Sequence, residues 1–241
     1  MIFAAGLGTR LKPITDTLPK ALVPIAGKTL LEHIILKLKG AGFNEILINV
    51  HHFPDQIIDF IHKNNAFGIR IEIADERNQL LDTGGGIKNA ASFFDDGKPF
   101  LVHNVDILSN IDLKELYLYH KQTHSFATLA VSSRNTFRYL LFDRNSNLKA
   151  WINEKTNETK PSNFIPQADY TKYAFSGIQI LSTEVFEWMQ KFPQKFSIMD
   201  FYLQTMQEKK IIGFVPSNYK MIDVGKLNVL EDAAQFVRES K

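Results

Sequence analysis

The first twenty residues, Met1–Lys20, read "MIFAAGLGTRLKPITDTLPK" and decide how the rest of the chain is interpreted. An apolar run typical of a strand ends at Ala5, and a loop with two glycines follows it. Glycine lets backbone N–H groups approach an anion closely. Arg10, Lys12 and Lys20 bring positive charge to the same stretch. The pattern indicates an anion site after a strand, although a plain tight turn would give these glycines equally well.

Strand and helix patterns alternate along residues 21–110. Apolar residues recur with helical spacing from Leu30 to Leu38, and Glu45–Val50 is an almost unbroken apolar run, as in a buried parallel strand. Further patterns predict helices at 54–68 and 84–94 and strands at 69–74 and 99–108. This order predicts a mainly parallel sheet between two helical layers, with ligands at the carboxyl ends of its strands.

Residues 111–241 have a different pattern. Strand-like runs are predicted at 125–132, 139–143, 148–155, 173–181 and 211–216, and helices at 184–190, 198–209 and 227–240. Short runs separated by polar turns favour a smaller antiparallel or mixed region. We therefore expect one α/β domain over residues 1–241, made of two halves, 1–110 and 111–241.

Composition excludes several classes of protein. With 28 basic and 26 acidic residues the net charge is only +2, so no general field attracts nucleic acid or a membrane surface. The absence of cysteine excludes disulfides, thiolate zinc sites and cysteine nucleophiles. No signal peptide and no apolar run of ~20 residues is present, which predicts a cytoplasmic protein. The first strand is short, and this suggests that Met1 is an internal residue of a longer chain.

A longer motif surrounds the glycine loop. Neither G-x-G-x-x-G nor G-x-x-x-x-G-K-[ST] follows the first strand. The stretch Gly6–His33 instead resembles the sugar-phosphate nucleotidyltransferase family, the NDP-sugar pyrophosphorylases, in which a G-x-G-T-R loop precedes a P-K-x-L-x-P segment. The matching residues are Gly6, Gly8, Thr9, Arg10, Pro19, Lys20, Leu22 and Pro24.

The resemblance implies a Rossmann-like α/β/α fold of the glycosyltransferase-A type, with 1–110 mainly binding nucleotide and 111–241 mainly binding sugar phosphate. In the reaction it implies, a sugar 1-phosphate attacks the α-phosphorus of a nucleoside triphosphate, so two polyanions must meet. Arg10 can bind the β- and γ-phosphates as a fork, and Lys20 can lie beside the α-phosphate. The other nucleotide-binding residues that it implies in this loop are Ala5, Gly6, Gly8 and Thr9.

Two aspartates are candidate metal ligands. Asp106 follows an apolar run, where a carboxylate is costly to bury unless it is paired or holds a metal. Asp223 lies just before the final helical pattern. Taken singly, each fits an ordinary strand end or helix start. The resemblance implies that together they hold Mg²⁺, which favours carboxylate, phosphate and water oxygens. Many relatives have a glycine before the first aspartate, where this chain has Val105.

Three histidines near these motifs are not assigned to chemistry. Attack by a sugar phosphate that is already ionised needs no general base, so His103 is interpreted as a structural residue. His51 and His52 are adjacent, but no third ligand accompanies them, and a zinc site is not predicted.

Two further segments match the family in the expected order. "LLDTGGGI" corresponds to the segment that contacts the nucleobase and ribose, which assigns nucleotide binding to Thr83, Gly84 and Gly85. "WINEKTNE" resembles an E-K-P element, and "YAFSGIQIL" resembles a strand that backs the sugar. The sugar-phosphate residues implied in this way are Glu154, Lys155 and Gly177. Without the resemblance, these would be a helix start and an exposed Glu-Lys pair in a hairpin.

The resemblance implies an enzyme that makes an NDP-sugar and pyrophosphate by Mg²⁺-assisted in-line attack, as a monomer or small homo-oligomer. The triple-glycine segment favours UTP with N-acetylmuramate 1-phosphate, in cell-wall sugar metabolism. GTP with mannose 1-phosphate, or another sugar 1-phosphate, is the alternative. A different class is a non-catalytic nucleotide-sensing subunit, but such a protein would be expected to lack one of the loop cations or aspartates, and this chain has them all.

Overall fold

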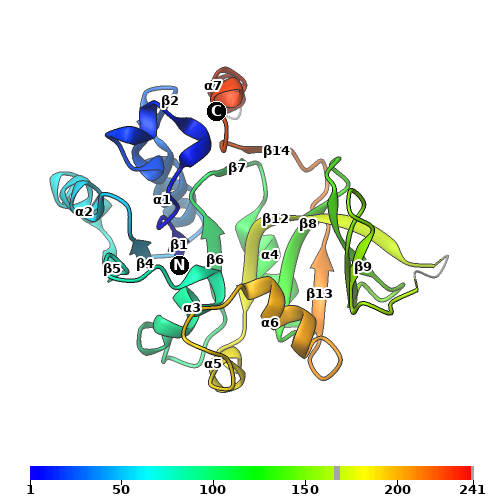
Figure 1. Cartoon of the computed structure of the whole chain (residues 1–241). Coiled ribbons are helices and arrows are strands. Elements are labelled where there is room, and N and C mark those ends of the chain that lie inside the picture. Colours follow the sequence, from blue (N-terminus) through cyan, green and yellow to red (C-terminus); the bar gives the residue numbers. More distant parts are fainter. Residues whose placement is uncertain (166–168, 240–241) are drawn as a thin grey trace. The chain divides into compact units, whose positions relative to one another are not determined.

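The computed structural model describes residues 1–165 and 169–239. The chain forms two compact units, each built from separate segments (Figure 1). The first unit comprises Met1–Leu81, His103–Lys114 and Lys220–Lys241, and the second comprises Asp82–Val102 and Glu115–Tyr219. Segments from the beginning, middle and end of the sequence therefore meet in the first unit.

Parallel strands form the centre of the first unit. They are β1 (Ile2–Phe3), β4 (Glu45–Val50), β5 (Arg70–Asp75) and the last two residues of β6 (Phe100–Asn104). β1 pairs in parallel with β4 on one side and with β6 on the other, and β4 pairs in parallel with β5. All of β4 except Glu45 is buried, as expected of a strand covered on both faces.

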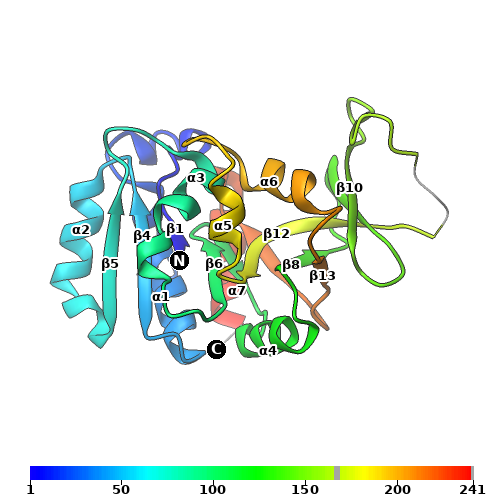
Figure 2. The ribbon, with the colours of Figure 1, turned by 90° about the horizontal axis from the view of Figure 1, so that it is seen from below.

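Helices pack against these strands. α1 (Leu30–Gly40) begins where the Thr29 hydroxyl accepts a hydrogen bond from the amide of Glu32, an N-cap worth about 1 kcal/mol. The predicted apolar stripe of α1 from Leu30 to Leu38 is buried. α2 (Pro54–Lys63) starts with proline at its first position and lies beside β5 (Figure 2).

Smaller elements complete the first unit. β2 (Pro24–Ile25) and β3 (Lys28–Thr29) form a hairpin, and β7 (Ile107–Ser109) pairs antiparallel with β14 (Met221–Asp223). α7 (Leu230–Glu239) contacts both β2 and β14. The predicted strand 99–108 is wrong in one respect, because a turn at Val105 and Asp106 divides it into β6 and β7.

The second unit is mainly antiparallel. Its strands are β8 (Ala127–Ser132), β9 (Arg138–Phe142), β10 (Leu148–Asn153), β11 (Glu158–Lys160), β12 (Thr171–Leu181) and β13 (Ile211–Phe214). The ladder runs β11-β10-β9-β12-β8, all antiparallel, and β13 joins β8 in parallel. The predicted α/β class, with a parallel core and a mixed sheet, is confirmed.

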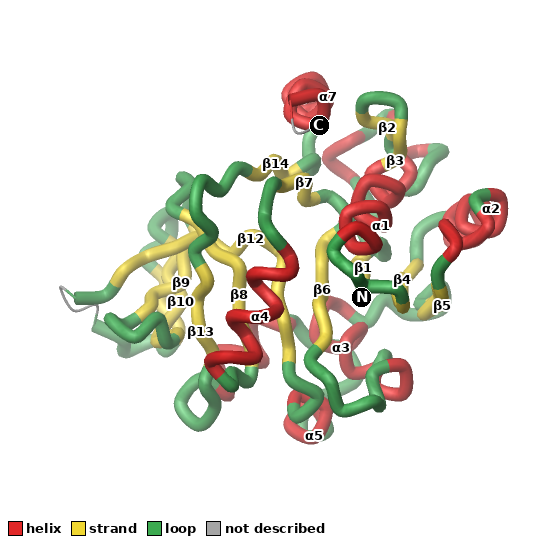
Figure 3. Tube along the Cα trace, turned by 180° about the vertical axis from the view of Figure 1, so that it is seen from behind, coloured by secondary structure: helices red, strands yellow, loops and turns green. Residues whose placement is uncertain are grey.

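Four helices belong wholly or mostly to the second unit: α3 (Asp82–Asn89), α4 (Leu113–Thr123), α5 (Val185–Met189) and α6 (Ile198–Thr205). α4, which the sequence patterns did not predict, crosses one face of the antiparallel sheet, where the His120 ring lies 2.9 Å from the Thr128 hydroxyl of β8 (Figure 3). Aromatic rings fill the core near α5 and α6, with Phe201 in contact with Phe126, Phe192 and Phe196. The predicted final helix residue Ser240 lies outside the described residues.

Candidate active site

The glycine loop of the first unit has one position that requires glycine. Gly8 has a φ of 64°, in the left-handed region that side chains disfavour. A Cβ at Gly8 would also lie 2.8 Å from the Thr15 methyl group and 3.1 Å from Lys20 Cβ. The Gly8 carbonyl accepts hydrogen bonds from the Leu11 amide and the Thr15 hydroxyl, both at 2.8 Å. The loop is therefore packed directly onto the stem of Lys20.

The remaining predicted loop residues differ in exposure. Ala5 is buried at the end of the strand, whereas Gly6 and Thr9 are exposed and face solvent. A Cβ at Gly6 would meet no atom within 4 Å. Thus Gly6 offers open space next to a backbone amide, the property that close approach of an anion requires.

Lys20 is a buried cation. Only 9% of the residue is exposed, and its ammonium group forms an ion pair with the carboxylate of Asp106. Buried lysines are rare unless they are paired, because the charge loses its hydration. By contrast Lys12, which the sequence left unassigned, forms an exposed surface pair with Asp16 at 2.9 Å.

The two predicted metal ligands, Asp106 and Asp223, are brought together by the β7–β14 ribbon. Asp223 is directly opposite Ile107 in the antiparallel register, one residue from Asp106. The amide of Val224 donates to the Asp106 carbonyl at 2.8 Å, which extends the pairing past the strand ends. Both carboxylates therefore belong to the same end of one two-stranded ribbon.

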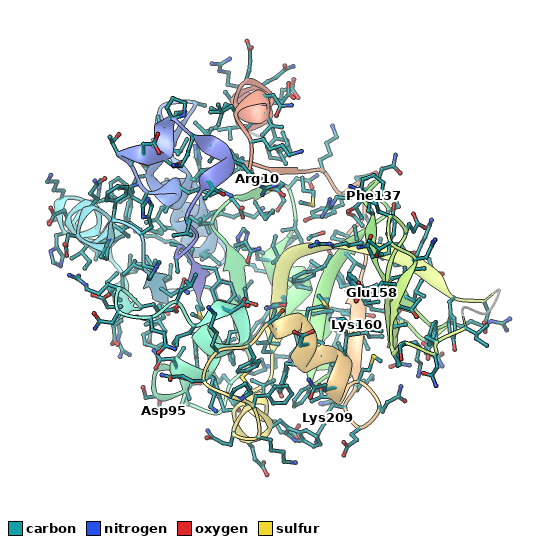
Figure 4. The ribbon with its side chains drawn as sticks, in the orientation of Figure 1. Arg10, Asp95, Phe137, Glu158, Lys160 and Lys209 are labelled. Carbon is teal, nitrogen blue, oxygen red and sulfur yellow. The ribbon has the colours of Figure 1, made fainter. Side chains whose placement is uncertain are left out.

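The Arg10 side chain extends from the glycine loop to the end of the β7–β14 ribbon that carries Asp223 (Figure 4). A Cβ added at Gly225 would lie 2.6 Å from a terminal nitrogen of Arg10 and 2.7 Å from a carboxylate oxygen of Asp223. Arg10 and Asp223 thus flank Gly225 from two sides. Within the described residues, no hydrogen bond or ion pair engages the Arg10 guanidinium or the Asp223 carboxylate. Both groups remain available to a ligand.

The donor set fits a hard cation with few protein ligands. Among the described residues, no cluster of three or more His, Cys, Asp or Glu side chains is present that would make a complete protein cage. Asp106 and Asp223 supply two carboxylates, and Lys20 engages a single oxygen of Asp106. Mg²⁺ is commonly held by one or two carboxylates, with phosphate and water oxygens as its other ligands.

His103 lies close to this group but is sealed from solvent. The residue has no exposed surface, and one ring nitrogen lies 2.8 Å from the Asn104 carbonyl. Burial lowers the pKa of the His103 imidazole to about 4. A ring that stays neutral and inaccessible at pH 7 is consistent with the structural interpretation of this residue.

The predicted base-contacting residues belong to α3 of the second unit. The amides of Gly84 and Gly85 both donate to the Phe196 carbonyl, at 2.9 and 3.2 Å. A Cβ at Gly84 would lie 2.3 Å from the Phe196 ring. Thr83 accepts a hydrogen bond from the Ile198 amide at 2.9 Å. Gly84 therefore permits close packing of α3 on residues 196–198, and these two amides are not free to bind a base.

The predicted sugar-phosphate residues lie on separate elements of the second unit. Glu154 follows β10 and pairs with Lys172 of β12 at 2.6 Å, while Lys155 is exposed in the adjoining turn. Gly177 lies in β12 with a φ of 73°, where the register with β8 shifts. The structure thus pairs Glu154 with a lysine other than its sequence neighbour.

Sequence reasoning missed three residues that shape these sites: Thr15, Gly225 and Lys172. Thr15 closes the glycine loop, Gly225 separates Arg10 from Asp223, and Lys172 pairs with Glu154. Only Gly225 had a visible signal, because it lies two residues after Asp223, which the sequence had already indicated as a candidate metal ligand. The other two contacts arise from tertiary folding.

Comparison with known proteins agrees with this geometry. Residues 1–240 match the family described as "Nucleotidyl transferase". The chain belongs to the nucleotidyl transferase family. In the part of the chain that the structure describes, every helix is too short or too polar to cross a bilayer.

Some relatives of this nucleotidyl transferase family member match it over part of its length, and others over almost all of it. N-acetylmuramate alpha-1-phosphate uridylyltransferase of Caulobacter vibrioides is 45% identical over 108 residues, which span 44% of each chain. The matched segment is therefore less than half the length of that relative. HddC of Yersinia pseudotuberculosis, solved in complex with GMP-PN, is 26% identical over 98% of this chain and 97% of that one, with a TM-score of 0.75. UDP-glucose pyrophosphorylase, solved with UDP-glucose, shares the fold at 20% identity, with a TM-score of 0.78 over 100% and 98% of the two chains.

Proposed function

We propose that the chain is a sugar-1-phosphate nucleotidyltransferase, which converts a nucleoside triphosphate and a sugar 1-phosphate into an NDP-sugar and pyrophosphate. The observation that carries this proposal is the convergence of two cations and two carboxylates beside the glycine loop. Arg10, Lys20, Asp106 and Asp223 come from distant parts of the sequence and meet at one end of the β7–β14 ribbon. Family membership supports the same reaction class.

In this proposal the two cations have different tasks. Arg10 is exposed and unpaired among the described residues, so its fork can bind the β- and γ-phosphates. Lys20 is buried and fixed, so it can stabilise negative charge at the α-phosphate without reorganising. The glycine loop contributes Ala5, Gly6, Gly8 and Thr9, of which Gly6 offers an amide in open space. Positioning and charge stabilisation suffice for in-line phosphoryl transfer, and no covalent intermediate is required.

Asp106 and Asp223 are the residues that would hold Mg²⁺. When bound, the ion would neutralise phosphate oxygens as charge moves to the leaving pyrophosphate. Lys20 pairs with one oxygen of Asp106, and no other ion pair or side-chain hydrogen bond engages this carboxylate among the described residues. The ion pair thus orients the carboxylate before a ligand binds.

The substrate pair proposed is UTP with N-acetylmuramate 1-phosphate, which would place the protein in cell-wall sugar metabolism. The 45% identity to the Caulobacter uridylyltransferase supports this pair. GTP with mannose 1-phosphate or another sugar 1-phosphate is the second candidate, supported by the guanine nucleotide named for the HddC complex. Thr83, Gly84 and Gly85 are proposed on the nucleotide side, through groups other than the Gly84 and Gly85 amides, which donate to the Phe196 carbonyl. Glu154, Lys155 and Gly177 are proposed on the sugar side. The enzyme is proposed to be cytoplasmic, as a monomer or small homo-oligomer.

The test is a matrix of pyrophosphate-release assays. UTP, GTP, CTP, dTTP and ATP are each combined with Mg²⁺ and with N-acetylmuramate, mannose and glucose 1-phosphates. The proposal predicts the fastest release with UTP and N-acetylmuramate 1-phosphate. Fastest release with GTP and mannose 1-phosphate would select the second candidate. Nucleotide binding without release from any pair would instead favour a non-catalytic, nucleotide-sensing protein.

A further inference from the structure

A buried polar network lies at the carboxyl ends of three neighbouring strands of the first unit. Asn49 of β4 and Glu76, just after β5, are each only 3% exposed. The Asn49 amide nitrogen donates to one carboxylate oxygen of Glu76 at 2.8 Å. The Asn49 carbonyl oxygen accepts from the Ala4 amide, after β1, at 2.9 Å, and the second Glu76 oxygen accepts from the Leu81 amide at 3.1 Å.

The network also organises the backbone around Glu76. The Glu76 amide donates to the Val50 carbonyl at 2.8 Å, and the Glu76 carbonyl accepts from the Gln79 amide at 3.0 Å. The His51 ring lies 2.7 Å from the same carbonyl. The segments that leave β1, β4 and β5 are therefore tied to a single buried pair.

A buried carboxylate and amide are not the pair that would give the folded protein the greatest stability. An apolar pair of similar volume often gives equal or greater stability, whereas a fully bonded polar pair specifies a single geometry. Neither side chain has an oxygen or nitrogen left without a partner among the described residues. The segment held on the β1 side leads directly into Ala5, Gly6 and the glycine loop. Carboxyl ends of parallel strands are also where α/β proteins bind their ligands.

We propose that Asn49 and Glu76 are positioning residues for the nucleoside triphosphate. They fix the end of β1 and the 77–81 segment through the Ala4 and Leu81 amides, and they do not touch the nucleotide. The inference rests on the proposed function, since it names a residue pair that prepares the same nucleotide site.

The direction of these hydrogen bonds allows a decisive swap. In Asn49→Asp an acceptor would replace the donor, so two carboxyl oxygens would face each other where the Asn49 amide nitrogen now donates to Glu76. In Glu76→Gln one amide group would point its hydrogens at another donor, either Asn49 or the Leu81 amide. In the double variant the new glutamine would donate to the new aspartate and still accept from Leu81. The double variant therefore restores every hydrogen bond and keeps the net charge of the wild type.

The experiment is calorimetric titration of UTP and GTP, with Mg²⁺, into the wild type, both single variants and the double variant. Each single variant should weaken the binding of the preferred nucleotide roughly tenfold, because a buried partner is left unsatisfied. The double variant should return to within about threefold of the wild type. Amide exchange at Ala4 and Leu81 should follow the same order. Glu72→Gln is the matched control, since Glu72 lies on β5 in an exposed ion pair with Arg70.

The outcomes separate the inference from the function on which it rests. Single variants that melt at a lower temperature but bind nucleotide as the wild type does when folded would overturn the positioning role. A double variant that stays as weak as the single variants would overturn it as well. A wild-type protein that binds no nucleoside triphosphate at all would instead overturn the proposed function.

Discussion

Replacement of Gly225 with alanine would place a methyl group between Arg10 and Asp223. The new Cβ would lie 2.6 Å from a terminal nitrogen of Arg10 and 2.7 Å from a carboxylate oxygen of Asp223. Ordinary contacts of this kind are about 3.5 Å or longer, so each group must move by about 1 Å. Both atoms are the ends of side chains, which can move without shifting the backbone. We therefore expect a loss of stability below ~1 kcal/mol.

The effect of Gly225→Ala on activity should be much larger. A displacement of about 1 Å in a charged positioning group can reduce turnover roughly 100-fold. The assay is the steady-state rate of pyrophosphate release with the preferred substrates, with urea unfolding to measure stability. Gly40→Ala is the matched control, because a Cβ at Gly40 meets no atom within 4 Å. Wild-type turnover in Gly225→Ala would refute the placement of Arg10 and Asp223 at the reacting phosphates.

Three other predictions concern Asp106, Gly84 and two buried histidines. Asp106→Asn should abolish pyrophosphate release and leave the circular dichroism spectrum unchanged, since it removes one carboxylate charge beside Lys20; a variant with wild-type turnover would contradict the metal assignment. Gly84→Ala should destabilise the protein by about 1–3 kcal/mol in urea unfolding, because its Cβ would lie 2.3 Å from the Phe196 ring; an unchanged midpoint would show that the ring moves freely. Burial lowers the pKa of His103 and His120 to about 4, so their neutral forms favour the folded state, and stability should fall as pH drops from 6.5 towards 4. The expected loss is roughly 2 kcal/mol for each histidine at pH 5, and equal urea midpoints at pH 7 and pH 5 would contradict it.

The sequence predicted secondary structure best where a single pattern of apolar residues ran through a whole segment. The buried stripe of α1 and the apolar run of β4 were predicted because each follows a single pattern without interruption. Helix α4 was missed because its buried face consists of Leu113, Leu116 and the polar His120, while Leu118 of the same helix is 55% exposed. The hydrogen bond between His120 and Thr128 of β8 is a tertiary contact, and it allows a polar residue where the helical pattern would require an apolar one.

The candidate site was predictable only in part. The sequence motifs named Arg10, Lys20, Asp106 and Asp223, but their order along the chain does not show that they meet. That meeting depends on the antiparallel register of β7 with β14, two strands separated by more than a hundred residues. The pair of Glu154 with Lys172 likewise depends on the ladder that joins β10, β9 and β12. Register of this kind is fixed by tertiary packing, which local patterns do not encode.

The most direct test of the central claim is the initial rate of pyrophosphate release from UTP and N-acetylmuramate 1-phosphate, measured with excess Mg²⁺ and again with excess EDTA. If Arg10, Lys20, Asp106 and Asp223 form a metal-dependent nucleotidyltransferase site, pyrophosphate should appear in step with UDP-sugar in the first reaction and should be absent from the second. If nucleotide binds but neither product forms with any sugar 1-phosphate in the matrix, the catalytic account is contradicted.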